Sequence, residues 1–156
     1  MTGDGALLTE YAVERRVLVP IRAIPPRMIQ AILAAEDQNF YSHFGIDPIG
    51  ILRAGVTNLQ ALGSGRRPIG ASTITQQVAQ AFLITKEVSV ERKIKEAILA
   101  LRLERSLGKD RILELYLNEI YLGFGAYGVA AAARNYFDKS LEDLSRLPFT
   151  SKQDLR

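Results

Sequence analysis

The chain has no cysteine and no tryptophan, a single histidine, and no long apolar run. Without cysteine it carries neither a disulfide framework nor a thiolate metal site. With one histidine it cannot form a metal site built from several histidines. No apolar run approaches the roughly 18 residues that a membrane-spanning helix needs, and residues 1–20 lack the basic start and apolar stretch of a signal peptide. We therefore expect any membrane anchor to lie outside this chain.

Charge of one sign is not concentrated anywhere in the chain. The 156 residues include 20 basic and 17 acidic side chains, and the net charge is +3. This distribution does not indicate a nucleic-acid-binding tail, although it allows a mild attraction to anionic ligands or lipid headgroups. The length fits one domain with a single core.

The apolar pattern predicts a mostly α domain. Residues 1–25 alternate weakly, which predicts an extended arm or a short strand. Three helix starts follow: Pro26 in a first turn, Asp47 as an N-cap before Pro48, and a capping box from Thr73 to Gln76. Two later helices are predicted over residues 110–122 and 129–136.

A further helix is predicted near residues 90–102, where five apolar residues share one stripe at 100° per residue. These residues are Val90, Ile94, Ala97, Ile98 and Leu101. Arg92 and Glu96 lie together on a different face, at i,i+4 spacing. The pattern therefore predicts that Glu96 is not forced into the core.

Two glycine-rich segments are predicted to be loops. Residues 62–70 combine glycine, serine and arginine and predict a mobile, basic loop. Residues 123–128 (GFGAYG) match the GxGxxG string of dinucleotide-binding folds. Because this string follows a predicted helix and not a strand, we reject a cofactor site and predict a tight turn between two helices.

Glu36 is the first candidate for catalysis. It ends an apolar helical segment and is followed by several polar side chains, including Asp37 and His43. A carboxylate in such a place is partly desolvated and held in position, as a proton acceptor should be. Glu36 and Glu96 would form the carboxylate pair of glycosyl chemistry if both faced one groove. The alternative is that each is simply solvated.

The helices predicted to begin at Thr73 and near residue 90 carry neutral and cationic side chains that are candidates for substrate binding. The start of the third helix carries hydroxyl and amide side chains that suit sugar hydroxyls or a phosphate, with helix capping as the alternative. They are Ser72, Thr73, Thr75, Gln76 and Gln77. Arg92, Lys93, Lys95 and Arg102 would neutralise a diphosphate if they faced the same groove, and otherwise form a solvated face. His43 is expected to hold the Glu36 loop by a hydrogen bond.

Taken in order, four segments resemble the motifs of glycosyltransferase family 51, which comprises class A penicillin-binding proteins and monofunctional peptidoglycan transglycosylases. They are residues 36–47 (EDQNFYSHFGID), 70–77 (GASTITQQ), 92–96 (RKIKE) and 112–128 (ILELYLNEIYLGFGAYG). Four motifs in the correct order over roughly residues 20–140 are far more specific than any one of them.

The resemblance implies a mostly α, lysozyme-like domain over residues 26–145, with residues 1–25 as an N-terminal arm and residues 146–156 as a divergent tail. After residue 145 the family continues into an alanine- and leucine-rich helix and a fifth motif, which this sequence does not match. The fold is therefore expected to lack its C-terminal helices.

The resemblance also implies the substrate and the reaction. The substrate would be lipid II at the outer, periplasmic face of the bacterial cytoplasmic membrane. Glu36 would remove the proton from the acceptor GlcNAc 4-hydroxyl, which attacks the donor MurNAc anomeric carbon with inversion and releases undecaprenyl diphosphate. The expected partners are the growing lipid-linked glycan, the membrane surface and a transpeptidase domain in the parent protein, with no nucleic acid.

By the same resemblance, Glu36 and Glu96 are the expected catalytic residues. A divalent cation, Mg²⁺ or Mn²⁺, would be held with Glu96, and no organic cofactor is expected. The expected substrate-binding residues are Asp37, Phe40, His43, Ser72, Thr73, Gln76, Gln77, Arg92, Lys93, Lys95 and Asn118.

The sequence departs from the family beside the second motif. The family commonly has a Lys-Asn pair where this chain has Gln80 and Ala81, and a glycine where it has Ala71. Two alternatives to the transferase are open. One is a catalytically silent module that binds lipid II or cell-wall partners, which the loss of a cation beside the donor diphosphate and the altered C-terminus allow. The other is a lysozyme-like hydrolase, which the cations of residues 92–96 disfavour because a neutral glycan needs no diphosphate site.

Overall fold

The computed structural model is helical throughout the residues that it describes, which are 18–63, 65, 70–83 and 89–146. Within them there is no β-strand, only an isolated bridge between Tyr121 and Tyr127. The prediction of a mostly α domain is confirmed. The helices are α1 (Pro26–Glu36), α2 (Pro48–Gln60), α3 (Ile74–Phe82), α4 (Val90–Ser106), α5 (Lys109–Glu119), α6 (Gly128–Phe137) and α7 (Leu141–Arg146), with short 3-10 helices at Ile21–Ala23 and Phe40–Ser42.

The three predicted helix starts are confirmed. Pro26 opens α1 in its first turn. Asp47 caps α2 by accepting a hydrogen bond of 2.9 Å from the Gly50 N–H, which holds the pKa of Asp47 below its ordinary value. Thr73 and Gln76 form a complete capping box at the start of α3, each bonding the backbone N–H of the other.

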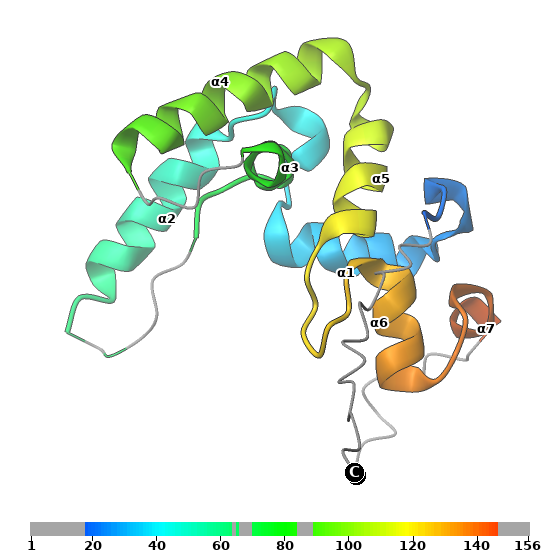
Figure 1. Cartoon of the computed structure of the whole chain (residues 1–156). Helices are drawn as coiled ribbons and strands as arrows, with labels where there is room; N and C mark the ends of the chain where they lie inside the picture. The colour runs from blue at the N-terminus through cyan, green and yellow to red at the C-terminus, as the bar shows by residue number, and fades with distance from the viewer. Residues whose placement is uncertain (1–17, 64, 66–69, 84–88, 147–156) are drawn as a thin grey trace, which may run out of the picture.

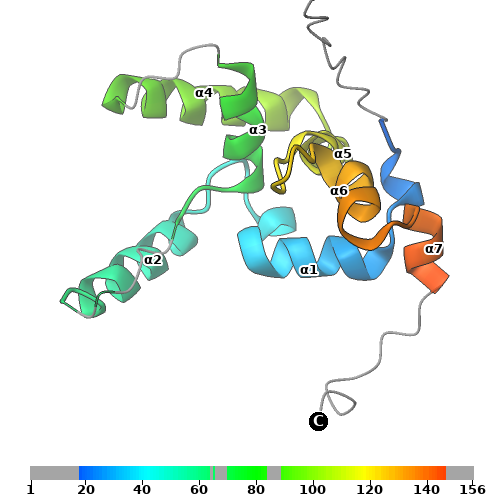
Figure 2. The ribbon, with the colours of Figure 1, turned by 60° about the horizontal axis from the view of Figure 1, so that its bottom comes forward.

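Helix α3 lies at the centre of the fold, packed against α4 on one side and α5 on the other (Figure 1). Helix α6 packs on α5, and α1 contributes Ile32 and Leu33 to the same core. Helix α2 projects away from this body in both views (Figures 1 and 2). The largest side chains sealed in the core include Phe40, Ile74, Ile112, Leu113 and Leu117.

The apolar stripe of α4 is not the face that turns inward. Four residues of the apolar stripe are exposed, namely Val90, Ile94, Ile98 and Leu101. The buried residues of α4 are instead Glu96 and Ala100. Two contacts explain this: Glu96 pairs with the Lys93 cation, and Gly45, which has no Cβ atom, lies close against the backbone of Ala100. The expectation that Glu96 stays out of the core is therefore wrong.

Residues 123–128 form the predicted turn between two helices, α5 and α6. Gly123, Gly125 and Gly128 all have positive φ angles, which residues with a Cβ atom rarely adopt. The Leu122 N–H donates to the Ala126 carbonyl at 2.9 Å and closes the turn. The predicted tight turn between two helices is confirmed.

Two of these glycines offer a matched pair of variants. In Gly128→Ala the new Cβ would lie 2.6 Å from the Asn118 carbonyl oxygen, in addition to the strain of a φ of +77°. In Gly125→Ala the φ is +71° but nothing lies within 4 Å of the new Cβ. We expect Gly125→Ala to lower the free energy of unfolding by about 1 kcal/mol and Gly128→Ala by about 3 kcal/mol. Chemical denaturation measures both, and equal losses would contradict this account of the turn.

Several predictions fall on residues outside the described part of the chain. They concern most of the N-terminal arm, most of the basic loop at residues 62–70 and nearly all of the tail at residues 146–156. Of the arm, residues 18–20 precede the first 3-10 helix. The short helix α7 was not predicted from the sequence.

Candidate functional site

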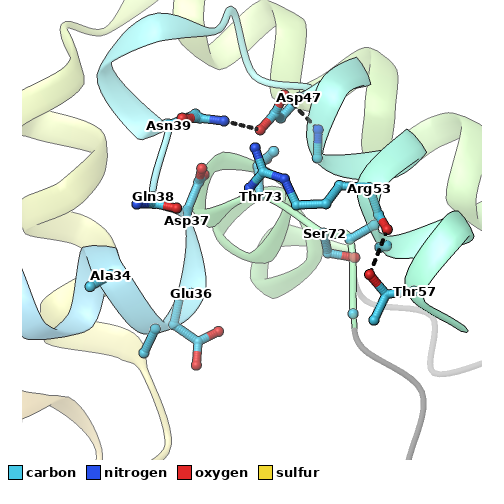
Figure 3. Close-up of a pocket in the computed structure, with 15 residues that line it drawn as sticks. Ala34, Glu36, Asp37, Gln38, Asn39, Asp47, Arg53, Thr57, Ser72 and Thr73 are labelled. Carbon is cyan, nitrogen blue, oxygen red and sulfur yellow. Dashed lines mark hydrogen bonds between the residues drawn. The ribbon is translucent and has the colours of Figure 1, made fainter. Parts of the chain in front are cut away.

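The end of α1 places two neighbouring carboxylates in opposite directions (Figure 3). Glu36 is exposed, whereas Asp37 is only 7% exposed. Both line a cavity of about 180 Å³ between the end of α1, the start of α2 and the segment before α3, here called the Glu36 pocket. Its polar lining also includes Asn39, Asp47, Arg53, Ser72 and Thr73.

Asp37 holds this region together from behind the pocket. Its carboxylate accepts a hydrogen bond of 3.0 Å from the Ile74 N–H at the start of α3, and the His43 Nε2 lies 2.9 and 3.0 Å from its two oxygens. The Gly45 N–H donates to His43 Nδ1 at 3.2 Å, so the proton of the neutral imidazole is on Nε2, facing Asp37. The Asp37–His43 pair is buried and fixes the end of α1 against α3.

The start of α3 divides the predicted polar cluster into two groups. Thr73 and Gln76 are buried and use their side chains in the capping box, and the Thr73 hydroxyl also donates to the Gly45 carbonyl at 2.6 Å. Ser72 and Gln77 are partly exposed. The Gln77 Nε2 donates to Glu36 Oε2 at 3.1 Å. Ser72 and Gln77 are therefore the members of the cluster that are placed to meet a ligand.

Helix α4 brings a cation to Ser72, one of the residues that line the Glu36 pocket. The Lys93 Nζ lies 3.0 Å from the Ser72 hydroxyl and also donates to Glu96 Oε1. The Glu96 side chain is 1% exposed, while that of Lys93 is 50% exposed. Lys93 is thus linked to the Glu36 pocket through Ser72, which lines it, and the buried Glu96 carboxylate holds the Lys93 ammonium group in place.

The groups around Glu96 do not fit a resident divalent cation. Within the described residues, no three His, Asp or Glu side chains are grouped as metal ligands. Glu96 Oε1 is taken by Lys93, which leaves Oε2, a buried oxygen without a hydrogen bond. Mg²⁺ needs about six oxygen ligands, and one carboxylate oxygen beside an ammonium group does not supply them.

A second cavity adjoins the Glu36 pocket. This groove of about 920 Å³, here called the Tyr116 groove, is lined by residues of α3 and α5 together with Leu18 and Arg92. Arg92 is partly buried, and its Nε has no hydrogen-bond partner. Gln77 lines this groove and bonds Glu36, so the two cavities meet at that contact.

Three predicted substrate contacts lie away from the site. Phe40 is 1% exposed and packs in the core, with the Lys109 ammonium 4.4 Å from the centre of its ring. The Asn118 amide accepts from Val19 N at 2.8 Å and donates to Val19 O at 2.9 Å, so it anchors the chain before α1. Lys95 is two residues from Lys93, or about 200° around the helix, and pairs with Glu91 at 2.6 Å.

Arg53 and Tyr116 line the two cavities but are not predicted as site residues by the sequence. Arg53 extends from α2 into the Glu36 pocket (Figure 3). It is the only charged residue of α2, and an isolated charge on an apolar helix was the available signal. Tyr116 is 3% exposed, yet its hydroxyl lies 3.4 Å from Gln77 Oε1. Its apolar neighbours on α5 predict a core residue, so periodicity gave no sign of this contact.

A helical domain that presents a carboxylate and cations around one polar cavity fits a glycosyl-transferring protein. The Transglycosylase family model matches residues 4–149, so the chain belongs to this family of peptidoglycan glycosyltransferases. Among curated proteins it is similar to penicillin-binding protein 1A of Rickettsia felis, with 58% identity over 142 residues, or 91% of this chain and 18% of that protein.

Other bacteria have relatives with the same name. Penicillin-binding protein 1A of Escherichia coli K12 is 51% identical over 144 residues, covering 92% of this chain and 17% of that protein. The Aquifex aeolicus protein is 51% identical over 141 residues, covering 90% of this chain and 19% of that protein. The chain therefore spans less than a fifth of the length of these relatives. Among its described residues, no helix is both long and apolar enough to cross a bilayer.

Proposed function

We propose that the chain is a peptidoglycan glycosyltransferase domain that polymerises lipid II into β-1,4-linked glycan. Family membership supports the class of reaction. The observation that carries the residue assignment is the Glu36 pocket, where Glu36 is the exposed carboxylate and the Ser72 hydroxyl accepts a hydrogen bond from the Lys93 ammonium group. A sugar hydroxyl needs the carboxylate as its base, and a diphosphate leaving group needs the cation.

In the proposed step, Glu36 takes the proton from the acceptor GlcNAc 4-hydroxyl. The freed oxygen forms a bond to the anomeric carbon of the donor MurNAc while the bond from that carbon to the phosphate oxygen breaks. The electron pair of the broken bond leaves with undecaprenyl diphosphate. Because the attack and the departure take place on opposite faces of the carbon, the configuration is inverted.

The remaining polar groups are proposed to bind and orient the substrate. Lys93, held by Glu96, and Arg92, with its unpartnered Nε, would neutralise the diphosphate. Ser72 and Gln77 would orient sugar and phosphate oxygens, and Arg53 adds positive charge on the opposite side of the Glu36 pocket. Glu96 acts in this account as a positioning residue for Lys93.

The proposed setting is the outer face of the bacterial cytoplasmic membrane, where lipid II and the growing glycan are held by their lipid. The relatives are several times longer than this chain. We propose that the parent protein also carries a transpeptidase domain, as class A penicillin-binding proteins do.

A second candidate function is a module that binds lipid II without polymerising it. It is favoured by Gln80, an exposed residue of the Tyr116 groove, at the position where the family commonly has lysine. One experiment separates the candidates: the purified chain is incubated with labelled lipid II and Mg²⁺, and separately with preformed glycan. Polymer supports the transferase, binding without polymer supports the silent module, and cleavage of glycan supports a hydrolase.

The Gln80 position gives a further prediction. Gln80→Lys would return a cation to the Tyr116 groove near Arg92, and we expect lipid II to bind roughly two- to five-fold more tightly, as an exposed charge pair allows. The same change at Gln60, an exposed residue of α2, serves as the control for added net charge. Equal gains from both variants, or none from Gln80→Lys, would count against a donor diphosphate in this groove.

A further inference from the structure

Three side chains from three helices form a hydrogen-bonded chain at the junction of the two cavities. The Tyr116 hydroxyl of α5 lies 3.4 Å from Gln77 Oε1 of α3, and the Gln77 Nε2 lies 3.1 Å from Glu36 Oε2 at the end of α1. Among the described residues, this amide is the group that bonds the Glu36 carboxylate. The position of the proposed base therefore depends on how the Gln77 amide is held.

Chemistry fixes the direction of every bond in this chain. An ionised carboxylate only accepts hydrogen bonds, so the Gln77 atom that faces Glu36 must be the nitrogen. The Gln77 oxygen then faces Tyr116, and it only accepts. Tyr116 must therefore be the donor, which requires its hydroxyl to be protonated.

The surroundings keep the Tyr116 hydroxyl protonated. Tyr116 is 3% exposed and belongs to the hydrophobic core, with Leu113 and Leu117 on the same helix. Burial raises the pKa of Tyr116 well above its ordinary value, and the negative charge of Glu36 raises it further. A group in this environment is a permanent donor at neutral pH. It is also rigid, because its ring is packed in the core.

We propose that Tyr116 is a positioning residue for the transfer reaction: through the Gln77 amide it fixes Glu36 Oε2 and leaves Glu36 Oε1 for the acceptor hydroxyl. The inference rests on the proposed function for its role in catalysis, but the orientation itself does not. Without the Tyr116 hydroxyl, the Gln77 oxygen loses its donor, and the amide can swing away from the Glu36 carboxylate into the Tyr116 groove. A displaced base lowers the rate more than it weakens binding.

Other charged groups also face this region. Asp37 and Asp47 line the Glu36 pocket with their carboxylates bonded to His43 and Gly50, and Arg53 extends into it from α2. Lys93 approaches on the Ser72 side, paired with Glu96. The Tyr116 hydroxyl bonds Gln77 and none of these groups, so a tyrosine-to-phenylalanine change leaves their hydrogen bonds and ion pairs in place.

The test uses nuclear magnetic resonance of the full chain and needs no activity. The Gln77 side-chain amide protons, assigned by their loss in Gln77→Ala, should show the chemical shift of an amide bonded to a carboxylate and should respond when Glu36 is protonated. In Tyr116→Phe we expect both signatures to be lost, with the resonances moving to the range of solvent-exposed glutamine. Tyr136→Phe is the matched control, because it removes a hydroxyl that bonds the Leu122 carbonyl at 2.6 Å.

A kinetic arm tests whether Tyr116 acts through Gln77. We expect Tyr116→Phe to lower kcat about ten-fold with KM nearly unchanged, and the double variant with Gln77→Ala to be no slower than Gln77→Ala alone. Thermal unfolding checks that the core is intact. Unchanged Gln77 resonances in Tyr116→Phe would overturn the inference even if the wild-type chain polymerises lipid II. Absence of polymer with the resonance change present would overturn the proposed function and leave the orientation by Tyr116 standing.

Discussion

Replacement of Glu36 by glutamine is expected to reduce glycan polymer formation by about 10²- to 10⁴-fold, the usual contribution of a general base. The amide has the same shape as the carboxylate but cannot accept the proton of a sugar hydroxyl. Because Glu36 is exposed at the end of α1, the change should leave the stability of the fold intact. Labelled lipid II incubated with the purified variant and resolved by size provides the measurement.

The control for Glu36→Gln is Glu91→Gln, an identical change at an exposed carboxylate of α4. Glu91 pairs with the exposed Lys95 at 2.6 Å, and such pairs contribute little to stability. Glu91→Gln should therefore keep the wild-type rate. A Glu36→Gln variant that still polymerises lipid II at a comparable rate would remove Glu36 from the role of base.

Replacement of Lys93 by methionine is expected to affect stability and activity together. The variant leaves the Glu96 carboxylate buried without its cation, which should lower the free energy of unfolding by about 2–3 kcal/mol. It also removes the cation proposed to neutralise the diphosphate, which should lower the polymerisation rate by about 10²-fold. Chemical denaturation and the lipid II assay measure the two effects separately.

A double variant separates these two roles of Lys93. In Lys93→Met with Glu96→Gln no uncompensated charge remains, so most of the lost stability should return while the polymerisation rate stays low. Lys95→Met, on the opposite side of α4, is the matched control and should change neither quantity strongly. Recovery of activity in the double variant would show that Lys93 serves only to neutralise Glu96.

Local signals in the sequence were sufficient to predict the helix starts and the glycine turn. Asp47 before Pro48 and the Thr73–Gln76 capping box act on backbone N–H groups within a few residues, so their effect does not depend on the rest of the fold. The turn at residues 123–128 is likewise set by positive φ angles at its glycines. Such features are recognisable wherever they occur.

The inward face of α4 could not be predicted, because it depends on contacts between distant residues. Periodicity identifies the more apolar stripe, but Ala100 is buried since the Gly45 backbone approaches it, and Glu96 is buried since Lys93 can pair with it. Neither contact can be predicted from the spacing of apolar residues along the helix. The burial of this carboxylate changes its proposed role from a catalytic residue to a positioning residue.

The family motifs predict the location of the site more accurately than they predict which side chains face it. Motif residues such as Phe40 and Asn118 hold the framework: Phe40 lies in the core, and Asn118 bonds the backbone of Val19. A motif marks positions where the family needs a particular residue type. The residue can be needed for close packing in the core as well as for contact with the substrate. Tyr116 has the opposite character, because it belongs to the core and its hydroxyl still reaches the site.

The central claim is that one exposed carboxylate, Glu36, acts as the base in a single displacement at the anomeric carbon. Measuring the anomeric configuration of the product tests this claim most directly. Lipid II with an α-linked diphosphate is supplied to the wild-type chain, and the new glycosidic bond is assigned by nuclear magnetic resonance. The account predicts a β linkage, formed with inversion and without a glycosyl-protein adduct. An α linkage, or a covalent sugar on Glu36 detected by mass spectrometry, would contradict it.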